Sequence, residues 1–169
     1  MYLFNFMLIC IFFKILNHNN IGEIMKDKNE LLMHIYETCD MGVKSTTKLL
    51  ELLKSKDNKI KKLLEEELKS YEKYLEKSKK YLKKNKVEPE GVGMMAEMMS
   101  SMEMKLEVKK DNSDSSIAGM LTQGFTMGII NMNKKIESYK DTCDSGVVEL
   151  AQDIVKFQEK EIKKLKEFL

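Results

Sequence analysis

The chain of 169 residues contains no arginine and no tryptophan, only one proline and only eight glycines. Proteins that recognise phosphate groups or base edges rely heavily on the bidentate guanidinium group of arginine. The absence of arginine, together with a formal net charge of +2, argues against a nucleic-acid partner. The scarcity of proline and glycine favours long uninterrupted helices over a β-sandwich, so we expect an all-α fold.

Cysteine and histidine, which supply most metal sites and many nucleophilic sites, are also scarce. Cys10, Cys39 and Cys143 are far apart and form no CxxC pair, so neither a zinc site nor a disulfide framework is indicated. The only histidines are His18 and His34, which excludes a recognisable Ser-His-Asp or Cys-His arrangement. We therefore expect a non-catalytic protein without a cofactor, in a reducing, cytoplasmic location.

The first 26 residues form an apolar leader that we expect to lie outside the fold. The apolar run 2–16 is shorter than the about 20 residues that a membrane helix needs, and it has no signal-cleavage site. Residues 21–24 can be encoded by a sequence like a ribosome-binding site, which favours translation starting at Met25. Two alternatives are a membrane anchor through residues 2–16, which requires residues 1–24 to be translated, and a cleaved signal.

Helical periodicity begins near residue 27 and continues to the C-terminus with few interruptions. We predict helices at about 29–55, 58–86, 94–109, 117–140 and 146–169. Asp57 or Asn58 is expected to cap the second helix, and the segment 87–91, which holds the single proline, ends it. The predicted units are a first hairpin at 27–86, a crossover at 87–113 and a second hairpin at 114–169, which together form one domain.

The second hairpin repeats the first at an offset of 86 residues. Gly42 aligns with Gly128, and the apolar positions and turns of the two halves coincide. The aligned pairs in the second helix of each hairpin are Leu64 with Leu150, Leu68 with Ile154, and Tyr71 with Phe157. The Met-rich helix is long enough to carry the chain back along the bundle. We therefore expect the first and third long helices to be antiparallel, with small residues around Gly42 and Gly128 allowing their backbones to approach.

Two tandem helical hairpins joined by a long crossover resemble the ferritin-like superfamily, in particular small bacterial four-helix bundles. The resemblance implies an antiparallel four-helix bundle with an extra Met-rich crossover helix. Metal-binding members place a glutamate on each of two helices and a Glu-x-x-His motif on each of the other two. The corresponding segments here are Glu67-Leu68-Lys69-Ser70 and Asp153-Ile154-Val155-Lys156, and neither contains histidine.

The repeat alignment nevertheless defines a candidate metal site. Glu37 aligns with Gln123, and Glu67 aligns with Asp153. Both Glu67 and Asp153 have apolar residues one turn away on either side. Four polar side chains could then converge near the middle of the bundle. The alternative function is therefore binding of iron or manganese, or a ferroxidase-like activity, at a degenerate carboxylate site. The competing interpretation is that these side chains are solvated or structural.

Two further features have more than one interpretation. His34 and Glu37 lie three positions apart on one helix face, which suits metal chelation, proton transfer or a half-exposed surface pair. Met95, Met98, Met99 and Met102 form a stripe on the predicted crossover helix, which we expect to pack on the bundle or a partner helix; capture of a peptide and binding of Cu(I) are alternatives. We expect the partner to be a second copy of the chain, or another protein, bound through helix faces.

Overall fold

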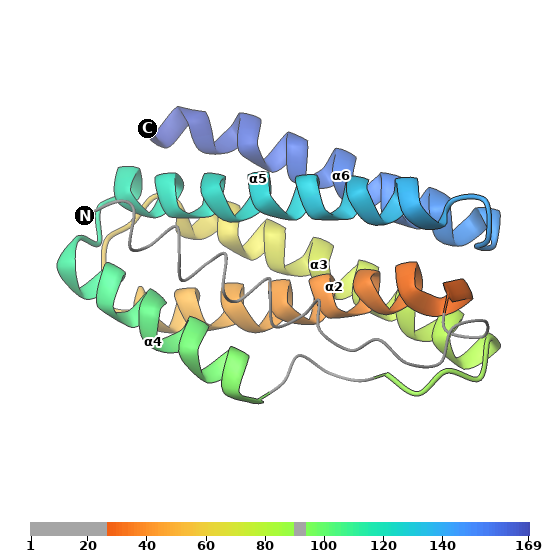
Figure 1. The fold of residues 1–169 in the computed structure, drawn as a ribbon. Helices are drawn as coiled ribbons and strands as arrows, with labels where there is room; N and C mark the ends of the chain where they lie inside the picture. The colour runs from red at the N-terminus through yellow and green to blue at the C-terminus, as the bar shows by residue number, and fades with distance from the viewer. Residues whose placement is uncertain (1–26, 90–93) are drawn as a thin grey trace.

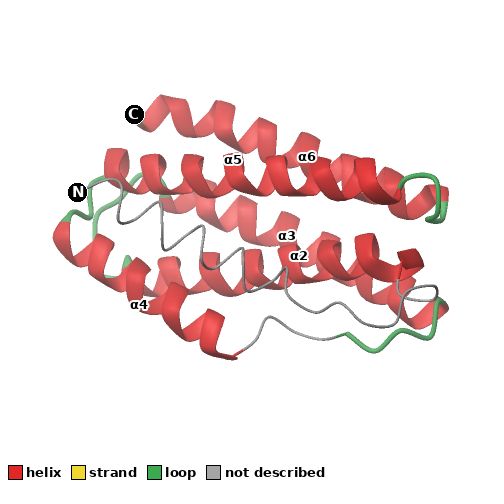
Figure 2. Ribbon diagram, viewed as in Figure 1, coloured by secondary structure: helices red, strands yellow, loops and turns green. Residues whose placement is uncertain are grey.

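The computed structural model describes residues 27–89 and 94–169, with the backbone alone for residues 27, 28 and 94–101. The predictions for the leader, for the start at Met25 and for Met95, Met98 and Met99 concern residues or side chains outside this description. Figure 2 shows helices joined by loops, with no strand, over the described residues. None of the helices within these ranges is long and apolar enough to cross a membrane.

Five α-helices form the described part of the fold, and they agree with the predicted periodicity to within a few residues at most ends. The helices are α2 (Asp27–Leu52), α3 (Lys61–Lys84), α4 (Met94–Lys110), α5 (Asp114–Tyr139) and α6 (Ser145–Leu165). A short 3-10 helix, η1 (Lys166–Phe168), follows α6. The all-α prediction is confirmed.

The helices pack as two hairpins, α2 with α3 and α5 with α6. Figure 1 shows that α2 and α5 run in opposite directions, and that α4 carries the chain back toward the end of the bundle where α5 begins. The predicted antiparallel relation between the first and third long helices is therefore confirmed. Helix α2 contacts each of the other four helices, and it consequently lies at the centre of the packing.

Apolar residues spaced three and four apart in the sequence form the core. On α2 this spacing buries Leu31, Ile35, Leu49 and, just beyond the helix, Leu53. Tyr71 of α3 and Phe157 of α6, which the repeat alignment pairs, contact each other edge to face with ring centroids 5.1 Å apart. When a two-fold axis relates two hairpins, equivalent residues that lie near this axis contact each other. The contact of Tyr71 with Phe157 is of this kind.

Side chains in the turns cap two helices, and one predicted cap is wrong. Ser113 caps α5 and Asp144 caps α6 through their side chains. Neither Asp57 nor Asn58 caps α3, which begins after Ile60 without a side-chain cap. Instead, Asn58 Nδ2 donates to a carboxylate oxygen of Asp114 at 2.7 Å. The amide side chain is therefore used to join the first hairpin to the start of the second.

The two aligned glycines accommodate side chains rather than a close backbone approach. A Cβ atom on Gly42 would lie 2.5 Å from the ring of Tyr71, and one on Gly128 would lie 2.9 Å from the amide nitrogen of Gln158. Gly124 has open space around it. Each glycine thus makes room for a large side chain of the other helix in its own hairpin.

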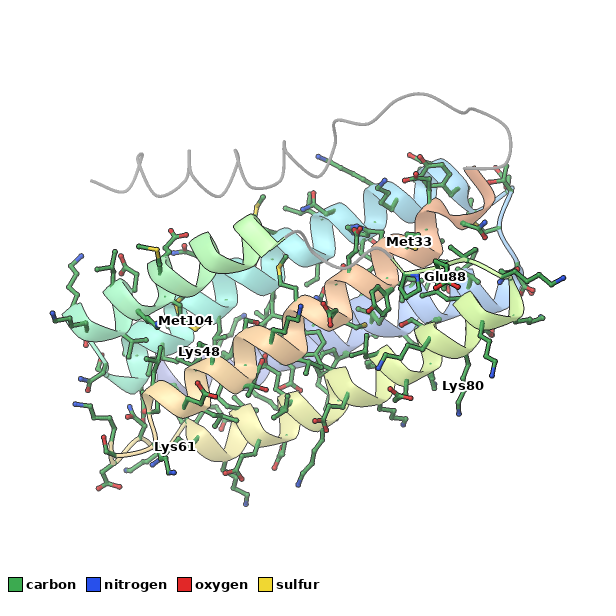
Figure 3. All side chains as sticks on the ribbon, turned by 90° about the horizontal axis from the view of Figure 1, so that it is seen from below. Met33, Lys48, Lys61, Lys80, Glu88 and Met104 are labelled. Atoms are coloured by element: carbon green, nitrogen blue, oxygen red, sulfur yellow. The ribbon has the colours of Figure 1, made fainter. Side chains whose placement is uncertain are left out.

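Helix α4 packs on α2 through Met104 and Val108, which are one turn apart. Figure 3 shows α4 beside the other helices, with Met104 labelled, while Lys80 on α3 extends away from the bundle. Met102 has the opposite orientation, because its side chain is 57% exposed. The helical phase of Met104 and Val108 places Met102 on the outer face, so Met102 does not pack on the bundle, and its packing on a partner helix stays a prediction.

Candidate functional site: a buried polar cluster between the hairpins

The four residues predicted to converge do not share one environment. Glu67 is buried, with 3% of its surface exposed, whereas Gln123 and Asp153 lie on the exposed surface and Glu37 is half-buried. The Asp153 carboxylate lies 3.9 Å from Lys156 Nζ. Among the residues that the structure describes, no group of three or more His, Cys, Asp and Glu side chains could hold a metal ion. The four residues therefore differ in their surroundings, and a metal site formed by them remains a prediction.

Glu67 instead belongs to a different set of buried polar residues, which we call the polar cluster. Its members come from three helices of both hairpins. They are Thr46 of α2, Glu67 and Tyr71 of α3, and Gln158 and Glu161 of α6. Each of these side chains is enclosed by the apolar core, so each must satisfy its polar atoms locally or lose hydration without compensation.

The hydrogen bonds of the polar cluster satisfy only part of its oxygen atoms. Thr46 Oγ1 donates to Glu67 Oε1 at 2.9 Å, and Gln158 Nε2 donates to the Tyr71 hydroxyl at 3.4 Å. Lys164 Nζ lies 3.0 Å from Glu161 Oε1. Glu67 Oε2, Gln158 Oε1 and Glu161 Oε2 are buried and have no hydrogen-bond partner among the described residues.

Burial controls the protonation of Glu67. Desolvation raises the pKa of this carboxyl group to about 8, and the hydrogen bond from Thr46 opposes the rise. The charge of Glu161 raises the same pKa further, while Lys164 lowers it. Near neutral pH the Glu67 carboxyl group is therefore largely protonated, and its charge state depends on a residue of the other hairpin.

Tyr71 links the polar cluster to the aromatic part of the core. Its ring stacks on Phe125 of α5 with a centroid separation of 6.4 Å, and it contacts Phe157 of α6 edge to face. Burial, followed by the charge of Glu67, raises the pKa of the Tyr71 hydroxyl. The hydroxyl therefore stays protonated over the physiological range and can donate a hydrogen bond.

An open groove of about 480 Å³ lies between α3 and α6 beside the polar cluster. Tyr74 and Phe157 contribute its aromatic lining, and Glu161 connects it to the buried oxygens. Lys164 bridges Glu161 and Glu66, with its Nζ atom 3.4 Å from Glu66 Oε2. Glu161 therefore belongs both to the lining of the groove and to the polar cluster.

His34 lies in a different part of the molecule, near the start of α2. The imidazole is half-buried, and burial followed by the charge of Lys135 lowers its pKa to about 4. The ring is therefore neutral at physiological pH. The chelating and proton-transfer roles suggested for His34 with Glu37 remain predictions.

A second surface with an unusual composition is the outer face of α4. Met102 and Leu106 are one turn apart, with 57% and 65% of their surfaces exposed. Exposed large apolar side chains on neighbouring turns are typical of a surface that binds another protein. The sequence marked α4 as Met-rich, but only the structure shows which of its faces is turned outward.

Comparisons with known proteins identify no relative of this chain. No protein-family model matches it, and neither a curated protein nor a solved structure matches it.

Proposed function

We propose that this chain is a ferritin-like helical bundle without catalytic activity, and that it acts by self-association through the outer face of α4. The superfamily assignment is supported by two equivalent hairpins, the antiparallel α2 and α5, and a crossover that returns along the bundle. The observation that carries self-association is the exposed pair of Met102 and Leu106.

Burial of these two side chains against a second copy is energetically favourable. Removing apolar surface from water contributes roughly 25 cal/mol per Å², and a symmetric dimer uses the same patch on both subunits. Methionine adds adaptability, because its unbranched thioether fits irregular surfaces. The sequence of α4 contains further methionines before Met102, toward the N-terminal end of the helix.

The charges that flank Leu106 also favour a second copy. Glu103 and Glu107 follow one side of the outer face at helical spacing, while Lys105 and Lys109 follow the other. In a parallel pair of α4 helices related by a two-fold axis along their length, the acidic side of each copy meets the basic side of its partner. The arrangement is the one that pairs charges across parallel coiled coils.

Sedimentation equilibrium of the full chain tests this proposal. We expect the wild-type protein to be dimeric at micromolar concentration, and the Met102→Lys, Leu106→Lys double variant to be monomeric. Ile130→Lys is the matched control, because Ile130 is also an exposed apolar residue, at 42%, but lies on α5. A wild-type protein that is monomeric at all concentrations, or a double variant that still dimerises, would refute the proposal.

The alternative of iron or manganese binding at Glu37, Glu67, Gln123 and Asp153 remains a prediction without support from their placement. Their differing exposure removes the geometric argument for it. If iron binds at these residues, the Glu37→Ala, Asp153→Ala variant should take up less iron than the wild type. Equal uptake would place the iron at another site.

A further inference from the structure

Three oxygen atoms without hydrogen-bond partners lie in the polar cluster, one on each of Glu67, Gln158 and Glu161. The three side chains are at most 3% exposed. Gln158 donates to Tyr71, which follows Glu67 by one helical turn, and Glu161 follows Gln158 by one turn. The hydrogen bond across the hairpins therefore places the α3 pair opposite the α6 pair.

Counting donors and acceptors shows an excess of acceptors in this space. The donors are the Thr46 hydroxyl, the Gln158 amide, the Tyr71 hydroxyl, Lys164 Nζ and, while Glu67 is protonated, its carboxyl O–H. The first, the second and Lys164 already bond to specific atoms. Carboxylate, amide and hydroxyl oxygens make up the acceptors. A buried acceptor without a donor costs about 1–3 kcal/mol, so the cluster is stabilised by anything that supplies positive charge to several oxygens at once.

We propose that the polar cluster is a binding site for a hard divalent cation, held by oxygen atoms of Glu67, Gln158 and Glu161 across the interface of the two hairpins. Ions of the Mg²⁺, Mn²⁺ and Ca²⁺ class prefer carboxylate and carbonyl oxygens. Binding displaces the proton of Glu67 to solvent, and the two carboxylates then supply a charge that balances one such ion. The proposed ligands include no His or Cys. Two of them are carboxyl groups and the third is the amide oxygen of Gln158, so the site differs from one built of three acidic or imidazole ligands.

The surroundings of the cluster allow an ion to enter and fix the ligands once it is bound. Glu161 lines the groove between α3 and α6, while Thr46 and Lys164 each hold one oxygen of a proposed ligand and leave the other available. Such partners orient carboxylate ligands in metal sites. Because the ligands belong to both hairpins, bound cation would also join the hairpins to each other.

Equilibrium dialysis of the chelator-treated full chain against Mn²⁺ alone is the first test. We expect one saturable site, and at least a roughly tenfold weaker affinity in Glu161→Gln and in Glu67→Gln. Asp153→Asn is the control, because Asp153 is the exposed repeat equivalent of Glu67 and its variant should bind as the wild type does. Circular dichroism confirms that each variant is helical.

Sensitised luminescence of Tb³⁺ locates the ion independently. Tyrosine transfers excitation to a nearby lanthanide, and Tyr71 is the tyrosine within the polar cluster. We expect Tyr71→Phe to abolish most of the sensitised emission while retaining Tb³⁺ binding. Tyr36→Phe, at a half-buried tyrosine of α2, is the matched control and should keep the emission.

The outcomes separate the proposal from its competitors. Absence of saturable Mn²⁺ binding to the wild type means that protons or water satisfy the cluster, and it overturns the proposal. Binding that survives in both Glu161→Gln and Glu67→Gln places the ion elsewhere and equally overturns it. Loss of binding in these two variants alone, together with loss of Tyr71-sensitised emission, supports it, and none of these results depends on whether α4 mediates self-association.

Discussion

At the scale of single residues, Glu67 is the side chain whose environment departs most from the ordinary environment of its type. It is a carboxylic acid that is buried against Thr46 and influenced by Glu161 and Lys164 from the other hairpin. The sequence placed Glu67 on an apolar stripe of α3, and its burial follows from that position. Its neutral state at pH 7 follows from burial and could not be derived from the sequence.

The raised pKa of Glu67 makes the stability of the protein depend on pH. The folded state holds the Glu67 proton up to about pH 8, whereas the unfolded state releases it near the ordinary glutamate pKa of 4.5. The stability associated with this proton is therefore fully present below pH 4.5 and is lost as the pH rises toward 8. The expected slope is about 1.4 kcal/mol per pH unit.

Urea unfolding between pH 6.5 and 8, with a chelator present, measures this effect. We expect the free energy of unfolding of the wild type to fall over this range, and that of Glu67→Gln to stay nearly constant. Asp153→Asn should behave as the wild type does. Equal pH profiles for the wild type and Glu67→Gln would show that Glu67 is solvated.

His34 has the opposite dependence on pH. Its pKa is lowered from 6.5 to about 4, so the unfolded state binds a proton between these values that the folded state does not. The stability associated with neutral His34 is present above pH 6.5 and is lost as the pH falls toward 4. In urea unfolding between pH 4 and 6.5 we expect His34→Gln to lose less stability than the wild type; the same loss in both proteins would contradict the burial of the ring.

Gly42 tests the packing of Tyr71 at the same scale. The Gly42→Ala variant should be less stable by roughly 1–3 kcal/mol, because the new methyl group overlaps the Tyr71 ring. Gly124→Ala should instead be neutral or stabilising, since this helical position has open space and alanine is the better helix former. Thermal unfolding of the two variants measures the contrast, and equal effects would contradict the described contact.

At the scale of the helices, most of the fold was predictable because the apolar periodicity and the repeat are strong signals. Gln158 and Glu161 were missed, because Gln158 directly precedes, and Glu161 belongs to, the five charged residues between positions 159 and 164, which look like a solvated helix end. Their spacing from Ile154, Phe157 and Leu165 by four residues was the available signal. Both residues are buried despite their polarity, because they occupy positions of the apolar stripe of α6, which continues to Leu165.

The phase of α4 was less predictable than that of the other helices. Methionine occurs on several sides of this helix, so the sequence does not distinguish a packing face from an exposed one. Contact with α2 selects Met104 and Val108, and this choice turns Met102 outward. A helix with a narrow apolar stripe would have allowed no such ambiguity.

The turn between α2 and α3 makes a polar contact that connects the two hairpins. Asp114 accepts hydrogen bonds from the Asn58 side chain at 2.7 Å and from the backbone N–H of Lys59 at 3.0 Å. We expect Asp114→Ala to lower the free energy of unfolding by about 1–3 kcal/mol, as loss of charge-assisted hydrogen bonds does. Asp141→Ala, in the exposed turn after α5, is the control in urea unfolding; equal effects of the two substitutions would contradict a specific role of Asp114.

At the scale of the whole molecule, the two hairpins bury one shared core that contains both aromatic and polar residues. Tyr71 and Phe157 meet near the axis that relates the halves, and the polar cluster lies beside them. The repeat predicted the symmetric part of this interface. It did not predict the cluster, because Gln158 and Glu161 align with Glu72 and Leu75 of the first hairpin, and the cluster is consequently asymmetric.

A carbon-detected NMR titration of the glutamate carboxyl groups, in the wild type and in Glu161→Gln, tests the contact between the hairpins most directly. A shared interface predicts that Glu67 titrates near pH 8 in the wild type and at a lower pH in Glu161→Gln, because the charge of Glu161 is removed. An ordinary Glu67 pKa near 4.5, or one that is unchanged by Glu161→Gln, would contradict the packing of α3 against α6.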